Sequence, residues 1–130
     1  IKDWRLVGSS GPAMAATLSK AIRDKEWIAV TGWKPHWKWA KWDLKFLKDP
    51  KNTMGSGEKI KSIGRQGIKE DLPQAAKLLS NYQLTTKQLG DIMLNINQKD
   101  MKPEKAAKKF VENHPKLVNS WIPGNEKVVK

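Results

Sequence analysis

The stretch EWIAVTGWKPHW, residues 26–37, decides the fold expected for this chain. Its residues 27–30 are all apolar, and Gly32 ends the run. A short apolar run bounded by glycine is typical of a strand that is buried on both faces of an α/β sheet. The stretch therefore predicts a central strand, and the elements around it are expected to cover that strand.

A helix is predicted directly before this strand. Ser9 or Ser10 can cap it, and Pro12 suits its first turn. Apolar residues recur with helical spacing on one of its faces: Met14, Leu18, Ala21 and Ile22. A further strand is predicted at residues 4–7. The order strand, helix, strand indicates a parallel βαβ crossover, so the predicted fold class is α/β.

Two more strands are predicted after the stretch, at residues 43–47 and 59–67, and the chain becomes helix-rich after residue 72. Pro73 and Pro103 begin helices, and Thr85 with Gln88 forms a capping box. Apolar residues recur with helical spacing in each of these helices: Ala75, Leu79 and Tyr82; Leu89, Ile92, Met93 and Ile96; Ala106, Ala107, Phe110 and Val111, which are predicted to point inward; and Leu117, Val118, Trp121 and Ile122 in a last turn or two.

Length and composition exclude several classes of protein. The 130 residues allow one domain, and the opening without Met suggests a fragment or a processed product. No apolar run approaches the roughly 20 residues of a membrane-spanning helix. Without cysteine there are no disulfides or thiolate sites. Because no HExxH, GxSxG or phosphate-loop motif occurs either, we expect no enzyme activity, no metal and no cofactor.

The charge is strongly positive. Lys and Arg number 25 against 13 Asp and Glu, which gives a net charge of +12. Such an excess favours nucleic acid, an anionic membrane surface or an anionic cell wall as a neighbour. Only three of the basic residues are arginines, Arg5, Arg23 and Arg65, although arginine makes most specific base and phosphate contacts. A solvated, lysine-rich surface explains the same numbers.

Four of the seven tryptophans lie in residues 33–42, among three lysines. Such a run is compatible with a stacking surface for single-stranded nucleic acid, a packed core or a cage for a small cation. Because large aromatic side chains are mostly buried, Trp39, Trp42 and Phe46 are predicted to be packing residues.

Trp33 and His36 stand apart from that packing. Trp33 follows Gly32 at the carboxyl end of the predicted central strand, where open α/β sheets bind ligands. An indole face attracts a quaternary ammonium, and a histidine nearby can hold a carboxylate. The pair therefore indicates a site for a zwitterion.

Residues 8–50, GSSGPAMAATLSKAIRDKEWIAVTGWKPHWKWAKWDLKFLKDP, and residues 67–82, GIKEDLPQAAKLLSNY, closely resemble the glycine betaine, proline betaine or carnitine substrate-binding proteins of bacterial ABC transporters. The resemblance covers roughly residues 4–122. It implies a two-lobed, type II periplasmic-binding-protein-like α/β fold that closes on a compatible solute. Residues 1–130 would be the carboxyl-terminal segment, with residues 1–30 ending one lobe and residues 31–130 returning to the other.

The resemblance also implies roles for individual residues. Trp33 matches a tryptophan of the cage that holds the ammonium, and His36 matches the histidine that contacts the ligand carboxylate. Trp37 is adjacent and completes the expected ligand-binding set as a contact or a buttress. The other cage residues would lie in a missing amino-terminal half. The chain departs from many relatives at Trp39 and Trp42.

The expected partners follow from the same resemblance. They are glycine betaine, proline betaine or carnitine, an ABC transporter permease and the missing amino-terminal half, with no nucleic acid. The expected location is the extracellular face of the cell membrane, lipid-anchored or fused to the transporter, or the periplasm. The basic surface would then face an anionic membrane or wall. A basic domain that binds single-stranded nucleic acid through its Trp/Lys surface is the alternative.

Overall fold

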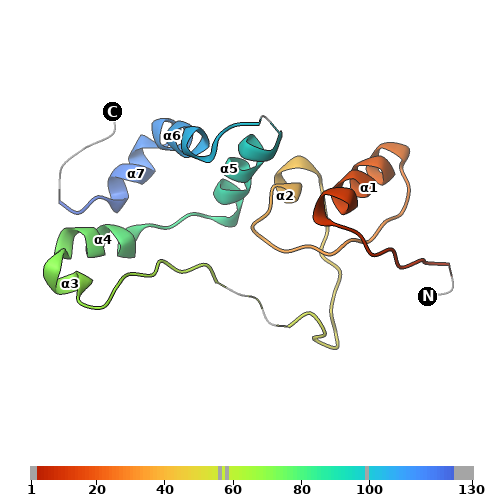
Figure 1. Cartoon of the computed structure of the whole chain (residues 1–130), viewed down its shortest axis with the longest axis horizontal. Helices are drawn as coiled ribbons and strands as arrows, with labels where there is room; N and C mark the ends of the chain where they lie inside the picture. The colour runs from red at the N-terminus through yellow and green to blue at the C-terminus, as the bar shows by residue number, and fades with distance from the viewer. Residues whose placement is uncertain (1–2, 56, 58, 99, 125–130) are drawn as a thin grey trace. The chain divides into compact units, whose positions relative to one another are not determined.

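The structure is a computed structural model that describes residues 3–55, 57, 59–98 and 100–124. The chain divides into two compact units, residues 1–34 and residues 35–130. The described residues form helices joined by segments without regular structure (Figure 1). Each unit is described in turn.

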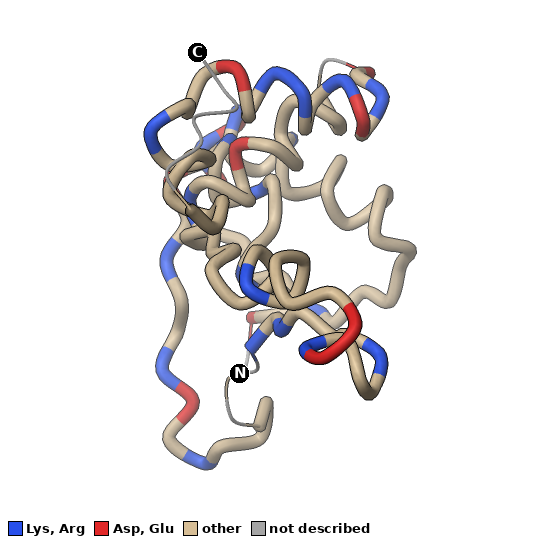
Figure 2. The backbone as a smooth tube through the Cα atoms, turned by 90° about the vertical axis from the view of Figure 1, so that its left-hand side faces the viewer, with Lys and Arg blue, Asp and Glu red and all other residues tan. Residues whose placement is uncertain are grey.

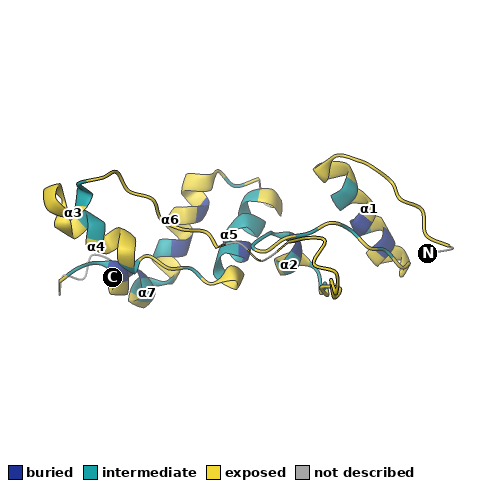
Figure 3. Cartoon of the chain, turned by 90° about the horizontal axis from the view of Figure 1, so that it is seen from below, coloured by how far each residue is buried: buried dark blue, intermediate teal, exposed yellow. Residues whose placement is uncertain are grey.

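The first unit is built on helix α1, Gly11–Asp24. Ser10 caps the helix, because its hydroxyl accepts a hydrogen bond from the Ala13 N–H at 3.4 Å. The helix ends at Lys25, which adopts a left-handed conformation with φ 58°. Leu18 and Ala21 are buried on one side of α1 (Figure 3). The capped helix and its apolar face agree with the prediction, except that Ile22 is exposed.

Residues 4–10 and 26–34 of the first unit run without a helical turn on either side of α1 (Figure 1). The second of these segments returns along the helix, and the Thr31 hydroxyl contacts Met14 Sδ at 3.5 Å. Thr31 therefore brings this segment into contact with α1 within the first unit.

The second unit holds the remaining helices of the described chain. They are α2 (Lys38–Lys41), α3 (Ile68–Asp71), α4 (Pro73–Asn81), α5 (Thr86–Gln98), α6 (Pro103–Asn113) and α7 (Pro115–Trp121). Proline stands in the first turn of α4, α6 and α7, where its fixed φ and missing N–H cost nothing. Between α2 and α3, the described residues 42–55, 57 and 59–67 contain no helix (Figure 1).

The core of the second unit consists of Phe110, Val118 and Trp121, with four half-buried residues packed against it: Leu84, Ile92, Val111 and Leu117. It forms where α6 contacts both α5 and α7, and α4 also packs on α7. Tyr82 meets the Trp121 ring edge-on, with 4.8 Å between ring centroids. The predicted inward positions of α6 are thus confirmed, except that Ala107 is exposed, and the apolar residues predicted for the last helix are buried or half-buried in α7 and at Ile122.

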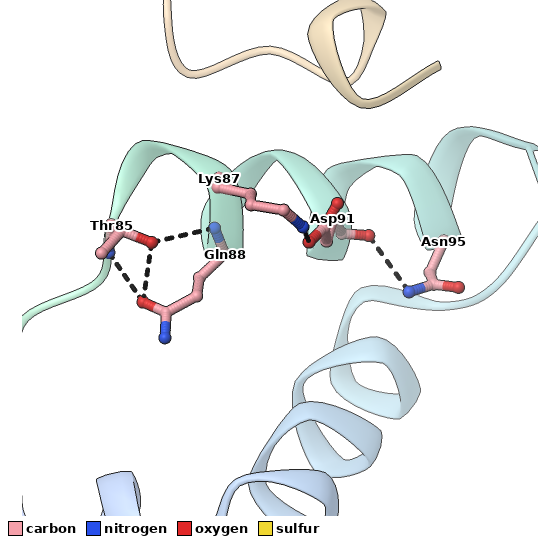
Figure 4. Close-up of polar contacts among 5 residues, drawn as sticks. All are labelled: Thr85, Lys87, Gln88, Asp91 and Asn95. Carbon is pink, nitrogen blue, oxygen red and sulfur yellow. Dashed lines mark hydrogen bonds and ion pairs between the residues drawn. The ribbon is translucent and has the colours of Figure 1, made fainter.

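The predicted capping box at the start of α5 is present (Figure 4). The Gln88 N–H donates to the Thr85 hydroxyl at 3.2 Å, and the Thr85 N–H donates to Gln88 Oε1 at 2.8 Å. Further along α5, Lys87 pairs with Asp91 at 2.8 Å. These local contacts begin the helix where the sequence predicts, and its apolar residues are half-buried as expected.

The four predicted strands are not formed within the described residues. The segments on either side of α1, residues 43–47 and residues 59–67 belong to no paired strand there. The βαβ crossover is therefore wrong for the chain as described. A strand exists only when a neighbour accepts and donates its ladder hydrogen bonds, and these segments make no such ladder with the residues that the structure describes. The short helices α2 and α3 were not predicted.

Among the residues that the structure places, no helix has the length and apolar character needed to cross a bilayer.

Candidate ligand-binding site

The sequence-predicted site residues fall in both units. Trp33 lies near the end of the first unit, and 60% of its surface is exposed. His36 and Trp37 open the second unit directly before α2, and both are half-buried. Pro35 precedes them and restricts the backbone at this point.

The His36 imidazole is held in one orientation by the backbone of α2. The Lys38 N–H donates to His36 Nδ1 at 3.2 Å, and the His36 carbonyl accepts from the Trp39 N–H at 3.2 Å. Because Nδ1 is the acceptor, a neutral ring carries its proton on Nε2. His36 can therefore donate an Nε2–H hydrogen bond to an anionic group.

Burial lowers the pKa of the His36 imidazole, and the positive charge of Lys38 lowers it further. Both causes disfavour the imidazolium, so the ring is neutral at pH 7. Lys38 itself is only 1% exposed, and burial lowers the pKa of its ammonium as well. A buried lysine next to His36 was not expected from the sequence, where it looks like one more solvated lysine.

Trp37 has packing neighbours within the second unit. Its ring centroid lies 5.4 Å from that of His36 and 5.5 Å from that of Trp42. The Lys41 ammonium lies 5.8 Å from the Trp37 ring and 4.8 Å from the Trp42 ring, both within cation–π range. These contacts suit a residue that buttresses His36.

Trp39 and Trp42 are half-buried packing residues, in agreement with the prediction, although neither is fully enclosed. Trp39 stacks on Phe46 with 4.2 Å between ring centroids. Within the second unit, Trp37 and Trp42 contact each other while Trp39 stacks on Phe46, so these three tryptophans divide between two aromatic contacts.

Helix α5 supports the segment that carries His36. Gly90 is buried, and a Cβ at that position would lie 3.7 Å from the His36 carbonyl oxygen and 3.9 Å from Ala40 Cβ. Sequence reasoning missed Gly90, although a single glycine inside a strongly periodic helix is a sign of close packing.

Charged residues do not gather at this site alone. Lysine and arginine occur along the whole described chain (Figure 2). Within the described residues, no three histidine, aspartate or glutamate side chains come together as ligands for a metal ion.

Comparison with known proteins identifies the family. Residues 1–113 match the model of the substrate binding domain of ABC-type glycine betaine transport systems. The chain belongs to this family. It is a family of transport binding domains and not of enzymes.

Individual members of the family are similar along nearly the whole chain. The glycine betaine/carnitine transport binding protein GbuC of Listeria monocytogenes serotype 1/2a (strain 10403S) is 48% identical over 126 residues. That alignment covers 97% of this chain and 42% of the relative.

Two solved structures extend the likeness to the fold. Lactococcal OpuAC, in a closed-liganded conformation complexed with glycine betaine, matches with a TM-score of 0.70 and 46% identity, over 93% of this chain and 47% of that one. The glycine betaine/L-proline-binding protein ProX of Borrelia burgdorferi matches with a TM-score of 0.65 and 33% identity, over 94% and 46%. This chain therefore shares its fold with part of the type II periplasmic binding proteins, and it spans less than half the length of these relatives.

Proposed function

We propose that this chain is part of a substrate-binding protein that captures glycine betaine for an ABC uptake system and carries out no catalysis. The observation that carries the proposal is the 46% identity to a protein whose closed structure contains glycine betaine. The family match over residues 1–113 supports it, and nothing in the comparisons supports the nucleic-acid alternative.

Trp33, His36 and Trp37 are the residues of this chain that we assign to the ligand. The exposed indole of Trp33 would face the trimethylammonium group, which an aromatic ring attracts without a formal charge. The Nε2–H of the neutral His36 would donate to the carboxylate. Trp37 would hold the His36 ring in place from its packed position.

The remaining parts of the proposal concern the longer protein. The chain would be the carboxyl-terminal segment of a two-lobed protein, with residues 1–30 in one lobe and 31–130 in the other. A missing amino-terminal half would supply the other cage residues, and closure of the lobes would exclude water and strengthen the cation–π contact. Proline betaine and carnitine are the other candidate ligands. The ABC transporter permease would be the partner. The protein would lie at the extracellular face of the cell membrane, lipid-anchored or fused to the transporter, or in the periplasm.

Titration calorimetry with glycine betaine on the full-length protein tests the assignment of Trp33. We expect Trp33→Ala to weaken binding about 30-fold or more, because one desolvated cation–π contact contributes about 2 kcal/mol. Trp39→Ala is the matched control. It should keep the affinity and lower the free energy of unfolding by about 2 kcal/mol, since Trp39 packs on Phe46. Equal affinity in both variants would remove Trp33 from the site.

A further inference from the structure

Lys41 lies across two tryptophan rings at the end of helix α2. Its side chain is exposed, yet its ammonium lies 4.8 Å from the centroid of the Trp42 ring and 5.8 Å from that of Trp37. The two rings are neighbours themselves, with 5.5 Å between their centroids and 50° between their planes. Because an aromatic face attracts a cation, this one ammonium joins both rings and opposes their separation.

An amide on α5 holds the same ammonium. Gln98 Oε1 accepts a hydrogen bond from Lys41 Nζ at 2.5 Å, and Gln98 Nε2 donates to Asn97 Oδ1 at 2.8 Å. The second bond keeps the amide oxygen turned toward the lysine. Because α2 packs on α5, these contacts tie the ring pair to the longer helix. A lysine on a surface normally samples many rotamers, but one that is bound at both the rings and an amide has a preferred position.

The ring pair reaches His36 through Trp37. The centroids of the His36 and Trp37 rings lie 5.4 Å apart, and the planes are tilted by 37°. The bond that selects the His36 tautomer, from the Lys38 N–H to Nδ1, is 3.2 Å long, which is the upper end of the usual range. Because such a bond is weak, the packing of Trp37 contributes to keeping the imidazole in place. A contact that fixes Trp37 therefore helps to fix His36.

We propose that Lys41 is a positioning residue of the betaine site, because it fixes Trp37 and thereby keeps the His36 Nε2–H available to the ligand carboxylate. The inference deepens the proposed function and rests on it, since that proposal assigns His36 to the carboxylate. Lys41 itself contacts the two tryptophan rings and the Gln98 amide, and it takes no part in holding the ligand.

The position of Lys41 also determines what Trp37 can do. The sequence leaves Trp37 as either a ligand contact or a buttress. Its ring already lies beside one cation and against the His36 ring. A trimethylammonium group at Trp37 would meet the like charge of Lys41, and this repulsion disfavours it there. Trp37 is therefore the buttress, and the ligand ammonium is directed away from the Trp37–Trp42 pair.

NMR of the full-length protein without ligand tests the positioning. At neutral pH, the nitrogen chemical shifts of the His36 imidazole give the ratio of its Nδ1–H tautomer to its Nε2–H tautomer. Lys41→Met keeps a flexible apolar side chain but loses the charge and the hydrogen bond to Gln98. We expect this ratio to rise about fivefold in Lys41→Met, which is the effect of losing about 1 kcal/mol from an exposed cation–π contact. A loss of overall stability alone would leave the ratio unchanged in the folded protein.

Two further variants control for charge and for side-chain length. Lys41→Arg keeps a cation for the two rings and should restore the wild-type tautomer ratio. Lys45→Met removes the same charge from an exposed lysine four residues further along, which makes no ring contact among the described residues, and it should also leave the ratio unchanged.

Titration calorimetry with glycine betaine measures the consequence for the ligand. We expect Lys41→Met to weaken binding about fivefold, whereas Lys41→Arg and Lys45→Met should stay within about twofold of the wild type. An unchanged tautomer ratio in Lys41→Met overturns the proposal, and so do equal betaine affinities in Lys41→Met and Lys45→Met. A wild-type protein that binds no glycine betaine refutes the proposed function instead, and the tautomer ratio then still decides whether Lys41 positions His36.

Discussion

At the scale of single residues, His36 shows how the surroundings of a side chain determine its chemistry. The Lys38 N–H bond to Nδ1 selects the tautomer, and burial together with the Lys38 charge keeps the ring neutral. A neutral imidazole with its proton on Nε2 is a hydrogen-bond donor without a net charge. Such a group suits a ligand that is itself neutral overall, such as a betaine.

The lowered pKa of His36 predicts how the stability of the protein depends on pH. The unfolded imidazole, with a pKa of about 6.5, binds a proton more readily than the folded one. The free energy of unfolding should therefore fall as the pH drops below about 6.5, because protonation favours the unfolded chain. An NMR titration of the His36 ring should give a midpoint below that value.

His36→Gln is the matched variant for this pH effect. A glutamine oxygen can still accept a hydrogen bond but does not titrate in this range, so the fall in thermal stability between neutral and mildly acidic pH should be smaller. A His36 midpoint at or above about 6.5 would contradict the expected neutral state.

At the scale of elements, the helices follow from local signals and the extended segments do not. Ser10 begins α1 and the Thr85–Gln88 pair begins α5, each at the place that the sequence indicates. These caps act within one turn, so a single side chain determines where the helix starts. The predicted strands have the composition of strands, but among the described residues they have no hydrogen-bonded partner strand.

The capping box of α5 gives a prediction at this scale. Thr85→Ala removes the acceptor for the Gln88 N–H and should lower the free energy of unfolding by about 1 kcal/mol. Thr86→Ala, one residue further and also exposed, is the control and should change stability by less than about 0.5 kcal/mol. Urea unfolding of the two variants measures the difference. Equal losses would show that the box does not stabilise α5.

At the scale of the whole molecule, the net charge of +12 does not explain binding of a zwitterionic ligand, because such a ligand has no net charge. A betaine gains little from the overall field of a protein, so its recognition would depend on local groups such as those proposed above, Trp33 and His36. The lysines along the chain instead suit the anionic membrane surface next to which the proposed binding protein would be held.

Vesicle binding tests this interpretation of the charge. We expect the protein to bind vesicles that contain phosphatidylserine at about 0.02 M salt and to dissociate at about 0.5 M, where the Debye length is only a few ångströms. Vesicles of phosphatidylcholine alone are the control and should bind little at either salt concentration. Binding to anionic vesicles that does not respond to salt would contradict the electrostatic origin.

The sequence by itself determined the capped helices and the apolar faces of α6 and α7, since helix hydrogen bonds and caps join residues only a few positions apart. It also determined the family, because the resemblance lies in the sequence itself. Only the tertiary structure revealed that Lys38 is buried, that Gly90 lies against the His36 carbonyl and that the predicted strands are unpaired among the described residues. Burial and strand pairing depend on residues far apart in the chain. A local pattern can show that a segment is suited to a sheet, but the sheet forms only where a second segment lies beside it.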